Sequence, residues 1–142
     1  MSVPARARLV WHDGQRYSGI DSWGTLVPID GDRSSAAGAK PSDLLPLSLA
    51  ACTAYTVIEV LRKQRQTVTG LEVDIAFEQD EAPPWPFRRI ECRFRLRGAV
   101  DPRKAERALQ LAHETQCSVA ATLAPAVELG FSIEVMDDGD AR

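Results

Sequence analysis

The sequence predicts a mixed α+β protein that forms one domain over residues 1–142. A chain of 142 residues with 44% hydrophobic residues has the length and composition of one ordinary globular domain. Strand-like alternation occurs near both ends and in the middle of the chain, and segments of helical periodicity separate these regions. The predicted order is strands, a long helix, two strands, helices and one strand, which is typical of α+β folds.

Short strands are predicted within residues 5–30. From residue 6 to residue 11, Arg6, Arg8 and Val10 alternate with Ala7, Leu9 and Trp11, and the strand pattern resumes at residues 16–19 and 25–29. His12-Asp13-Gly14 and Gly24 supply residues that favour turns. Residues 31–38 are small and polar, so we expect a loop before the next element.

A long helix is predicted from Pro41 to about Arg65. Pro41 and Ser42 are helix start signals, and Asp43 suits the positive end of the helix dipole. The first half of this helix is apolar nearly all round, which indicates a central helix rather than a surface one. Its uncharged run covers 44–58, fewer than the roughly 20 apolar residues that a membrane span needs.

A hairpin is predicted from two alternating segments, 71–78 and 90–97. Apolar residues occupy one face of each segment, whereas the other face is acidic in the first segment and basic in the second. Antiparallel pairing would place these opposite charges across from each other. We therefore interpret the arginines as half of a charge-paired sheet face rather than as a nucleic-acid site. A net charge of −3 likewise indicates no general attraction to nucleic acid or anionic membranes.

Further helices are predicted before the last strand. Asp101-Pro102 opens one that runs to about Thr115, and another is expected over 119–129. Phe131, Ile133 and Val135 mark a final strand, followed by a polar tail at 137–142. A hot-dog thioesterase would instead have one helix before an unbroken run of strands, so this order argues against that fold.

Three cysteines are too few and too scattered for a secreted disulfide framework or a zinc site. The N-terminus has no apolar stretch of signal-peptide length, so we expect a cytoplasmic protein. Cys92, between Ile90 and Phe94 on a strand, is interpreted as a core residue.

The other two cysteines have settings that suit redox chemistry. Cys52 lies mid-helix among small residues, and Cys117 opens a helix, where a thiolate is favoured. They are candidates for an attacking and a resolving thiol, although a cysteine taken alone is more often a small core residue than a reactive one. Sequence spacing does not show whether the two meet.

Both of these cysteines lie in longer segments that carry a resemblance. The first segment is Lys40-Pro41-Ser42-Asp43-Leu44-Leu45 with Ala50-Ala51-Cys52-Thr53-Ala54. The second is Glu106-Arg107-Ala108 and Leu111 with Cys117-Ser118-Val119 and Thr122-Leu123. Together with Trp11-His12, Asp21-Ser22-Trp23-Gly24 and Pro86-Phe87, they resemble the OsmC/Ohr family over about residues 8–135.

The resemblance implies a fold in which antiparallel sheets wrap around a long central helix in an intertwined homodimer. It implies a thiol peroxidase that reduces organic hydroperoxides without a metal or bound organic cofactor. Cys52 would become a sulfenic acid, Cys117 would resolve it to a disulfide, and a dithiol, typically a dihydrolipoyl group, would restore both thiols.

Two further site residues are transferred from the family pattern. Arg16 is the candidate for the arginine that supports the Cys52 thiolate, and Asp43 is the candidate for the acid that holds this arginine. The family's Gly-Arg-Asx-Gly context is missing around Arg16, and Ser42 is the other candidate for the acid position. The alternative function is an OsmC-like binding or structural protein with redox-competent cysteines but no dedicated peroxidase activity.

Overall fold

The computed structural model describes residues 2–137. The chain has two compact units, which divide between Leu45 and Pro46. The polar tail predicted at 137–142 lies outside the described residues beyond Asp137. The expectation of a single domain over residues 1–142 stays a prediction.

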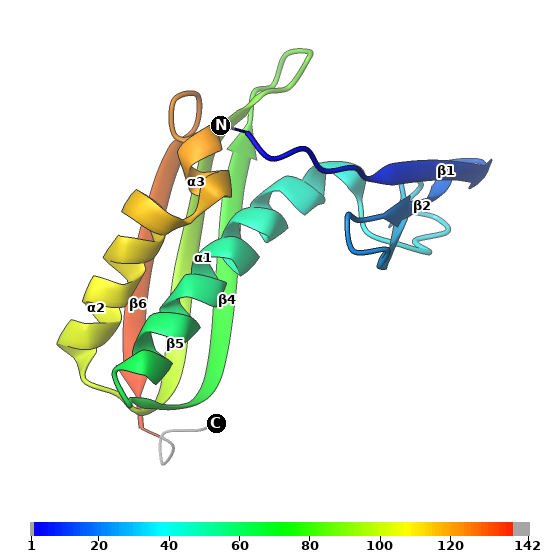
Figure 1. Cartoon of the computed structure of the whole chain (residues 1–142). Coiled ribbons are helices and arrows are strands. Elements are labelled where there is room, and N and C mark those ends of the chain that lie inside the picture. Colours follow the sequence, from blue (N-terminus) through cyan, green and yellow to red (C-terminus); the bar gives the residue numbers. More distant parts are fainter. Residues whose placement is uncertain (1, 138–142) are drawn as a thin grey trace. The chain divides into compact units, whose positions relative to one another are not determined.

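The first unit contains a small antiparallel sheet. Its strands are β1 (Arg8–Asp13), β2 (Arg16–Ile20) and β3 (Leu26–Asp30), in that spatial order (Figure 1). Gly14 and Gly24, in the two connections, have φ angles of +50° and +85°, which glycine adopts at no steric cost. The strands and turns predicted for this part of the chain are confirmed.

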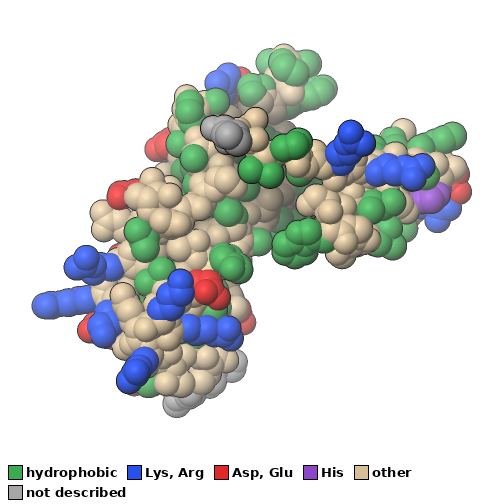
Figure 2. Space-filling model, in the orientation of Figure 1, with side chains coloured by type: hydrophobic (Ala, Val, Ile, Leu, Met, Phe, Trp, Pro, Cys, Tyr) green, Lys and Arg blue, Asp and Glu red, His purple; other side chains and the backbone are tan. Residues whose placement is uncertain are grey.

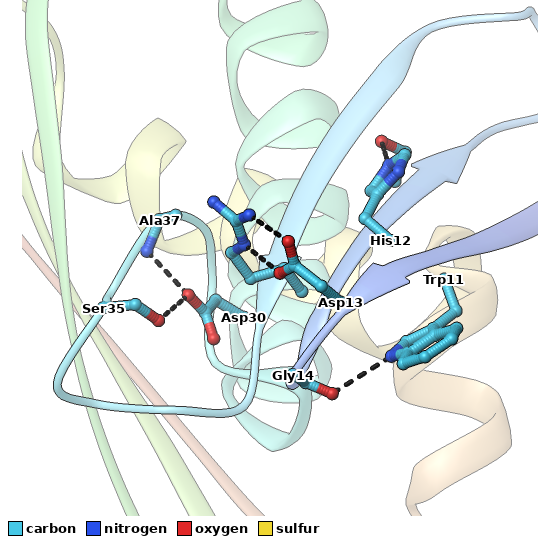
Figure 3. A network of polar contacts seen from close by, with 9 residues as sticks. Trp11, His12, Asp13, Gly14, Asp30, Ser35 and Ala37 are labelled. Carbon is cyan, nitrogen blue, oxygen red and sulfur yellow. Dashed lines mark hydrogen bonds and ion pairs between the residues drawn. The ribbon is translucent and has the colours of Figure 1, made fainter.

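A buried carboxylate organises the loop that follows β3. Asp30 is 4% exposed and accepts hydrogen bonds from the Ser35 hydroxyl and, at 2.9 Å, from the Ala37 amide (Figure 3). It also accepts a hydrogen bond from the Asp32 amide at 2.8 Å. The Ser35 hydroxyl, followed by these two amides, lowers the pKa of Asp30 below its usual value. The charged carboxylate therefore ties both ends of the loop to the end of β3.

The second unit places helices on one face of a three-stranded sheet (Figure 1). Helix α1 (Leu44–Lys63) follows a 3-10 turn, η1 (Pro41–Asp43). The sheet comprises β4 (Thr67–Gln79), β5 (Phe87–Ala99) and β6 (Glu128–Met136). Between β5 and β6 come α2 (Pro102–Leu111), a π-helical turn η2 (Ala112–Gln116) and α3 (Ser118–Leu123).

Strands β4 and β5 pair in the register that the charge pattern predicts. Glu72 lies opposite Arg95 and Asp74 opposite Arg93. Arg95 forms ion pairs with Glu72 at 2.8 Å and with Asp74 at 3.1 Å. The arginine stripe is thus part of a charge-paired sheet face, as expected.

The strand that closes the sheet differs from expectation. We expected antiparallel sheets, but β6 runs parallel to β5, with Cys92 opposite Phe131. A parallel pair needs a long crossover between its strands, and the helical segments α2, η2 and α3 form that crossover. The helix predicted over 119–129 is also too long, because α3 ends at Leu123 and Leu129 already belongs to β6.

The core of the second unit lies between α1, α2 and the sheet. Leu49, Val57 and Leu61 of α1 are fully buried, as are Ile90 and Leu96 of β5. The exposed side of α1 nevertheless remains apolar, since Leu47 is 50% and Tyr55 70% exposed. Figure 2 shows hydrophobic side chains at the surface of both units. One chain thus covers only part of its apolar helix.

Candidate active site

Cys52 and Cys117 meet in the second unit. Cys52 projects from α1, and Cys117 is the single extended residue between η2 and α3. The side chains of Cys52 and Cys117 interact, which lowers the pKa of Cys52 and contributes to raising that of Cys117, and both cysteines are free thiols. Residues that are 65 positions apart in the sequence thus form one site.

Backbone contacts fix the position of Cys117. Its amide donates to the Ala112 carbonyl at 2.8 Å, across the wide turn of η2. Its sulfur accepts a hydrogen bond from the Ala120 amide at 3.3 Å. Cys117 is only 3% exposed, whereas Cys52 is partly exposed. A π-helical turn adds one residue to a helical segment and is frequent at functional sites. Here the turn leads directly into Cys117.

The start of α3 influences the acidity of Cys52. Besides the Cys117 side chain, the Val119 and Ser118 amides and the Ser118 hydroxyl lower the pKa of Cys52. Polar donors near a sulfur favour its charged form, because a thiolate is a better acceptor than a neutral thiol. Such a setting suits a nucleophilic thiol.

The two thiols differ in acidity. Burial raises the pKa of Cys52, but the hydrogen bonds from Cys117, Val119 and Ser118 together outweigh burial and lower it below 9.0. Burial, followed by the hydrogen bond to Cys52, raises the pKa of Cys117. Cys52 is therefore the more acidic of the two thiols. The Ala120 and Val119 amides at the helix opening do lower the pKa of Cys117, as expected, but burial and the interaction with Cys52 outweigh them.

Cys92 is a core residue, as predicted. It is fully buried on β5, and burial, with smaller contributions from Cys117 and Glu91, raises its pKa to about 11. A thiol of that pKa is almost entirely protonated at neutral pH, so Cys92 is a poor nucleophile.

Arg16 and Asp43 lie in the first unit, and the structure does not pair them. Arg16 instead holds Asp13 through two hydrogen bonds of 2.6 Å (Figure 3). This bond raises the pKa of Arg16 and lowers that of Asp13. Asp13 is three residues away across the β1–β2 turn, so this nearby carboxylate pairs with the guanidinium. Asp43 ends η1, where its amide donates to the Lys40 carbonyl at 3.0 Å. The roles of Arg16 and Asp43 at Cys52 stay predictions.

Sequence reasoning missed Ser118 and Val119 as neighbours of Cys52. The available signal was the motif Cys117-Ser118-Val119 itself, in which a hydroxyl and two free amides follow a helix-capping cysteine. Over residues 2–137, the structure brings no three His, Cys, Asp or Glu side chains into an arrangement suited to a metal ion.

The long helix on a mixed sheet and the paired thiols define a class of α+β protein with two cysteines in one site. The chain belongs to the family of OsmC-like proteins, whose model matches residues 31–132. Both Cys52 and Cys117 lie within that match. The family resemblance noted in the sequence is thus confirmed.

Individual relatives span nearly the whole chain. Protein YhfA of Escherichia coli K12 is 31% identical over 132 residues, which cover 92% of this chain and 98% of YhfA. A hypothetical protein from Aquifex aeolicus VF5 has a similar structure, with a TM-score of 0.86, 26% identity and coverage of 97% and 99%. An organic hydroperoxide resistance protein OsmC from Legionella pneumophila shares the fold, with a TM-score of 0.67, 17% identity and coverage of 94% and 98%.

Proposed function

We propose that this protein is a thiol-dependent peroxidase that reduces organic hydroperoxides and is regenerated by a dithiol. The observation that carries the proposal is the interaction of a partly exposed Cys52, whose pKa is lowered, with a buried Cys117, whose pKa is raised. It pairs an accessible nucleophile with a buried thiol in contact with it. The name of the Legionella pneumophila protein supports organic hydroperoxides as the substrate class.

The first step oxidises Cys52. Its thiolate attacks the terminal oxygen of the hydroperoxide, so an S–O bond forms and the O–O bond breaks. Cys52 becomes a sulfenic acid, and the alkoxide leaves and takes up a proton to form the alcohol. Because Cys52 is partly exposed, its sulfur is open to a small peroxide.

The second step forms a disulfide between the two cysteines. The Cys117 sulfur attacks the sulfur of the sulfenic acid, so an S–S bond forms and the S–O bond breaks. The hydroxide that leaves combines with the proton of Cys117 to form water. At 3% exposure, Cys117 is shielded from other oxidants and reacts with its neighbour. An external dithiol, such as a dihydrolipoyl group, then reduces the disulfide by two exchange reactions and is itself oxidised.

Stopped-flow measurement of hydroperoxide consumption tests this function. We expect cumene hydroperoxide to react faster than hydrogen peroxide, and dihydrolipoate to support turnover better than dithiothreitol or thioredoxin. Slow, equal reaction with both peroxides and no turnover with dihydrolipoate would contradict the proposal.

That contrary result would favour the second candidate, an OsmC-like binding or structural protein with redox-competent cysteines. One observation favours it: the principal interactions of Cys52 within residues 46–137 involve no charged side chain. A nearby cation is the commoner means of activating a thiol. For either function we propose a reducing, cytoplasmic location, in which both thiols are kept reduced.

A further inference from the structure

We infer that His113 is a positioning residue of this site, whose ring, stacked on Phe131, holds the π-helical turn that leads into Cys117. The centroids of the two rings are 4.4 Å apart, and the ring planes are within 7° of parallel. The inference deepens the proposed function, on which it rests in taking Cys117 as the thiol that resolves Cys52.

The backbone of η2 determines where Cys117 lies. The Cys117 amide donates to the carbonyl of Ala112, five residues earlier, at 2.8 Å. Turns of this width are rare, since an α-helix bonds each amide to the carbonyl four residues earlier. The Thr115 hydroxyl donates to the Leu111 carbonyl at 2.9 Å, but this bond lies within the same helical segment. It therefore does not attach the turn to the sheet.

The His113 ring attaches the turn to the sheet. Phe131 lies on β6, opposite Cys92 of β5, and packs against the core of the second unit. Within η2, Ala112 is buried and His113 is partly buried, whereas residues 114–116 are exposed. Ala112 presents only a methyl group, so His113 is the larger of the two side chains that the turn directs inward. The stack thus fixes the turn four residues before Cys117.

The stack needs an aromatic ring but no charge. Burial lowers the pKa of His113 below its usual value, and the nearby Glu114 raises it by less, so the ring is neutral at pH 7. A neutral imidazole on a phenyl ring is an aromatic pair, which phenylalanine can also form. His113→Phe therefore keeps the stack, and His113→Ala removes it. A thiol held in place reacts with its neighbour more readily than one that must first be ordered.

The test is the equilibrium of the Cys52–Cys117 disulfide with glutathione, measured by mass spectrometry after alkylation of the free thiols. Its constant reports how well the fold holds the two thiols together. We expect His113→Ala to lower this constant about fivefold, the equivalent of one aromatic pair, and His113→Phe to match the wild type. Phe131→Leu should act like His113→Ala, and the double variant should lose little more, because both changes remove the same contact. His12→Ala, at the other histidine of the chain, is the matched control and should change nothing.

An unchanged constant in His113→Ala, or a loss that His113→Phe does not restore, would overturn the inference. If His113→Ala does not fold, His113→Leu, which keeps apolar volume without a ring, takes its place, and equal constants in His113→Leu and His113→Phe would overturn it. The glutathione assay uses no peroxide. A lowered constant in a protein without peroxide turnover would therefore reject the proposed function and leave the role of His113 standing. A wild type that forms no such disulfide would reject both.

Discussion

Single residues determine which of the three cysteines reacts. Cys52 and Cys117 interact, but the pKa of Cys52 is lowered by Cys117, Val119 and Ser118, whereas burial and Cys52 raise the pKa of Cys117. Cys92 is as buried as any core residue and receives no comparable donors. All three residues are cysteines, so the differences in their acidity follow from the atoms around each sulfur.

Replacing each cysteine in turn should separate the two chemical steps. After one equivalent of organic hydroperoxide, Cys52→Ser should consume none of it, because the attacking sulfur is gone. Cys117→Ser should leave a stable sulfenic acid on Cys52, detectable with dimedone, since the first oxidation needs no partner thiol. Cys92→Ser is the control and should behave like the wild type. Peptide mapping that finds Cys92 in the disulfide, or a fully active Cys52→Ser, would disprove the mechanism.

Arg16 can be tested by the pH dependence of alkylation, measured on the Cys52 peptide by mass spectrometry with iodoacetamide. If its guanidinium supports the thiolate, Arg16→Ala should raise the apparent pKa of Cys52 and slow alkylation at neutral pH. Arg8→Ala, a change at an exposed arginine on β1, serves as the control. An unchanged profile for Arg16→Ala would leave Arg16 with its structural role beside Asp13.

At the scale of elements, the sequence predicted the features that depend on residues close together in the chain. The β4–β5 register follows from side-chain alternation and opposite charges, and Asp101 accepts from the Arg103 amide at 2.9 Å as a helix cap should. Strand direction depends on the crossover, so the parallel pairing of β6 had no signal in its own residues. The two site cysteines were identified from their helical settings. The interaction of these two cysteines, and the effect of Ser118 and Val119 on Cys52, join segments far apart in the sequence and arise only in the folded chain.

The loop after β3 should depend on the charge of Asp30. Its pKa is lowered in the folded state, so its stabilising effect is present above the ordinary carboxyl pKa and is lost as pH falls through the lowered value. We expect Asp30→Ala to speed hydrogen exchange at the Asp32 and Ala37 amides, and acid to do the same in the wild type. Asp21→Ala, at a different turn of this sheet, should leave these two amides unchanged. Equal protection of these amides in Asp30→Ala would contradict this role.

At the scale of the whole molecule, the exposed apolar side of α1 is a surface that another protein chain could bury. Over 18 residues within 41–63 the mean hydropathy is 1.7, yet only 39% of that window is buried in one chain. Leaving large apolar side chains in water costs free energy, roughly 25 cal/mol for each Å² that a partner could bury. We propose that a second copy of this chain covers this surface, as the family resemblance also implies.

A stable homodimer is the expected result in analytical ultracentrifugation. Its interface should be apolar and should exceed about 2,000 Å², the size typical of obligate dimers. Leu47→Asp, which places a charge on the exposed side of α1, should shift the protein toward the monomer, whereas Ser132→Asp should not. A 15.6 kDa species at micromolar concentration would contradict the dimer.

The parallel pairing of β6 with β5 determines when, during synthesis, Cys52 and Cys117 can come together. Cys52 leaves the ribosome early, but Cys117 lies in the crossover at 100–127, which is anchored only when β6 pairs with β5. Pairings between distant segments form late, because the connecting chain must close first. A nascent chain thus carries Cys52 before Cys117 and the start of α3 are in place beside it. We therefore expect Cys52 to react as an ordinary thiol until β6 has been synthesised.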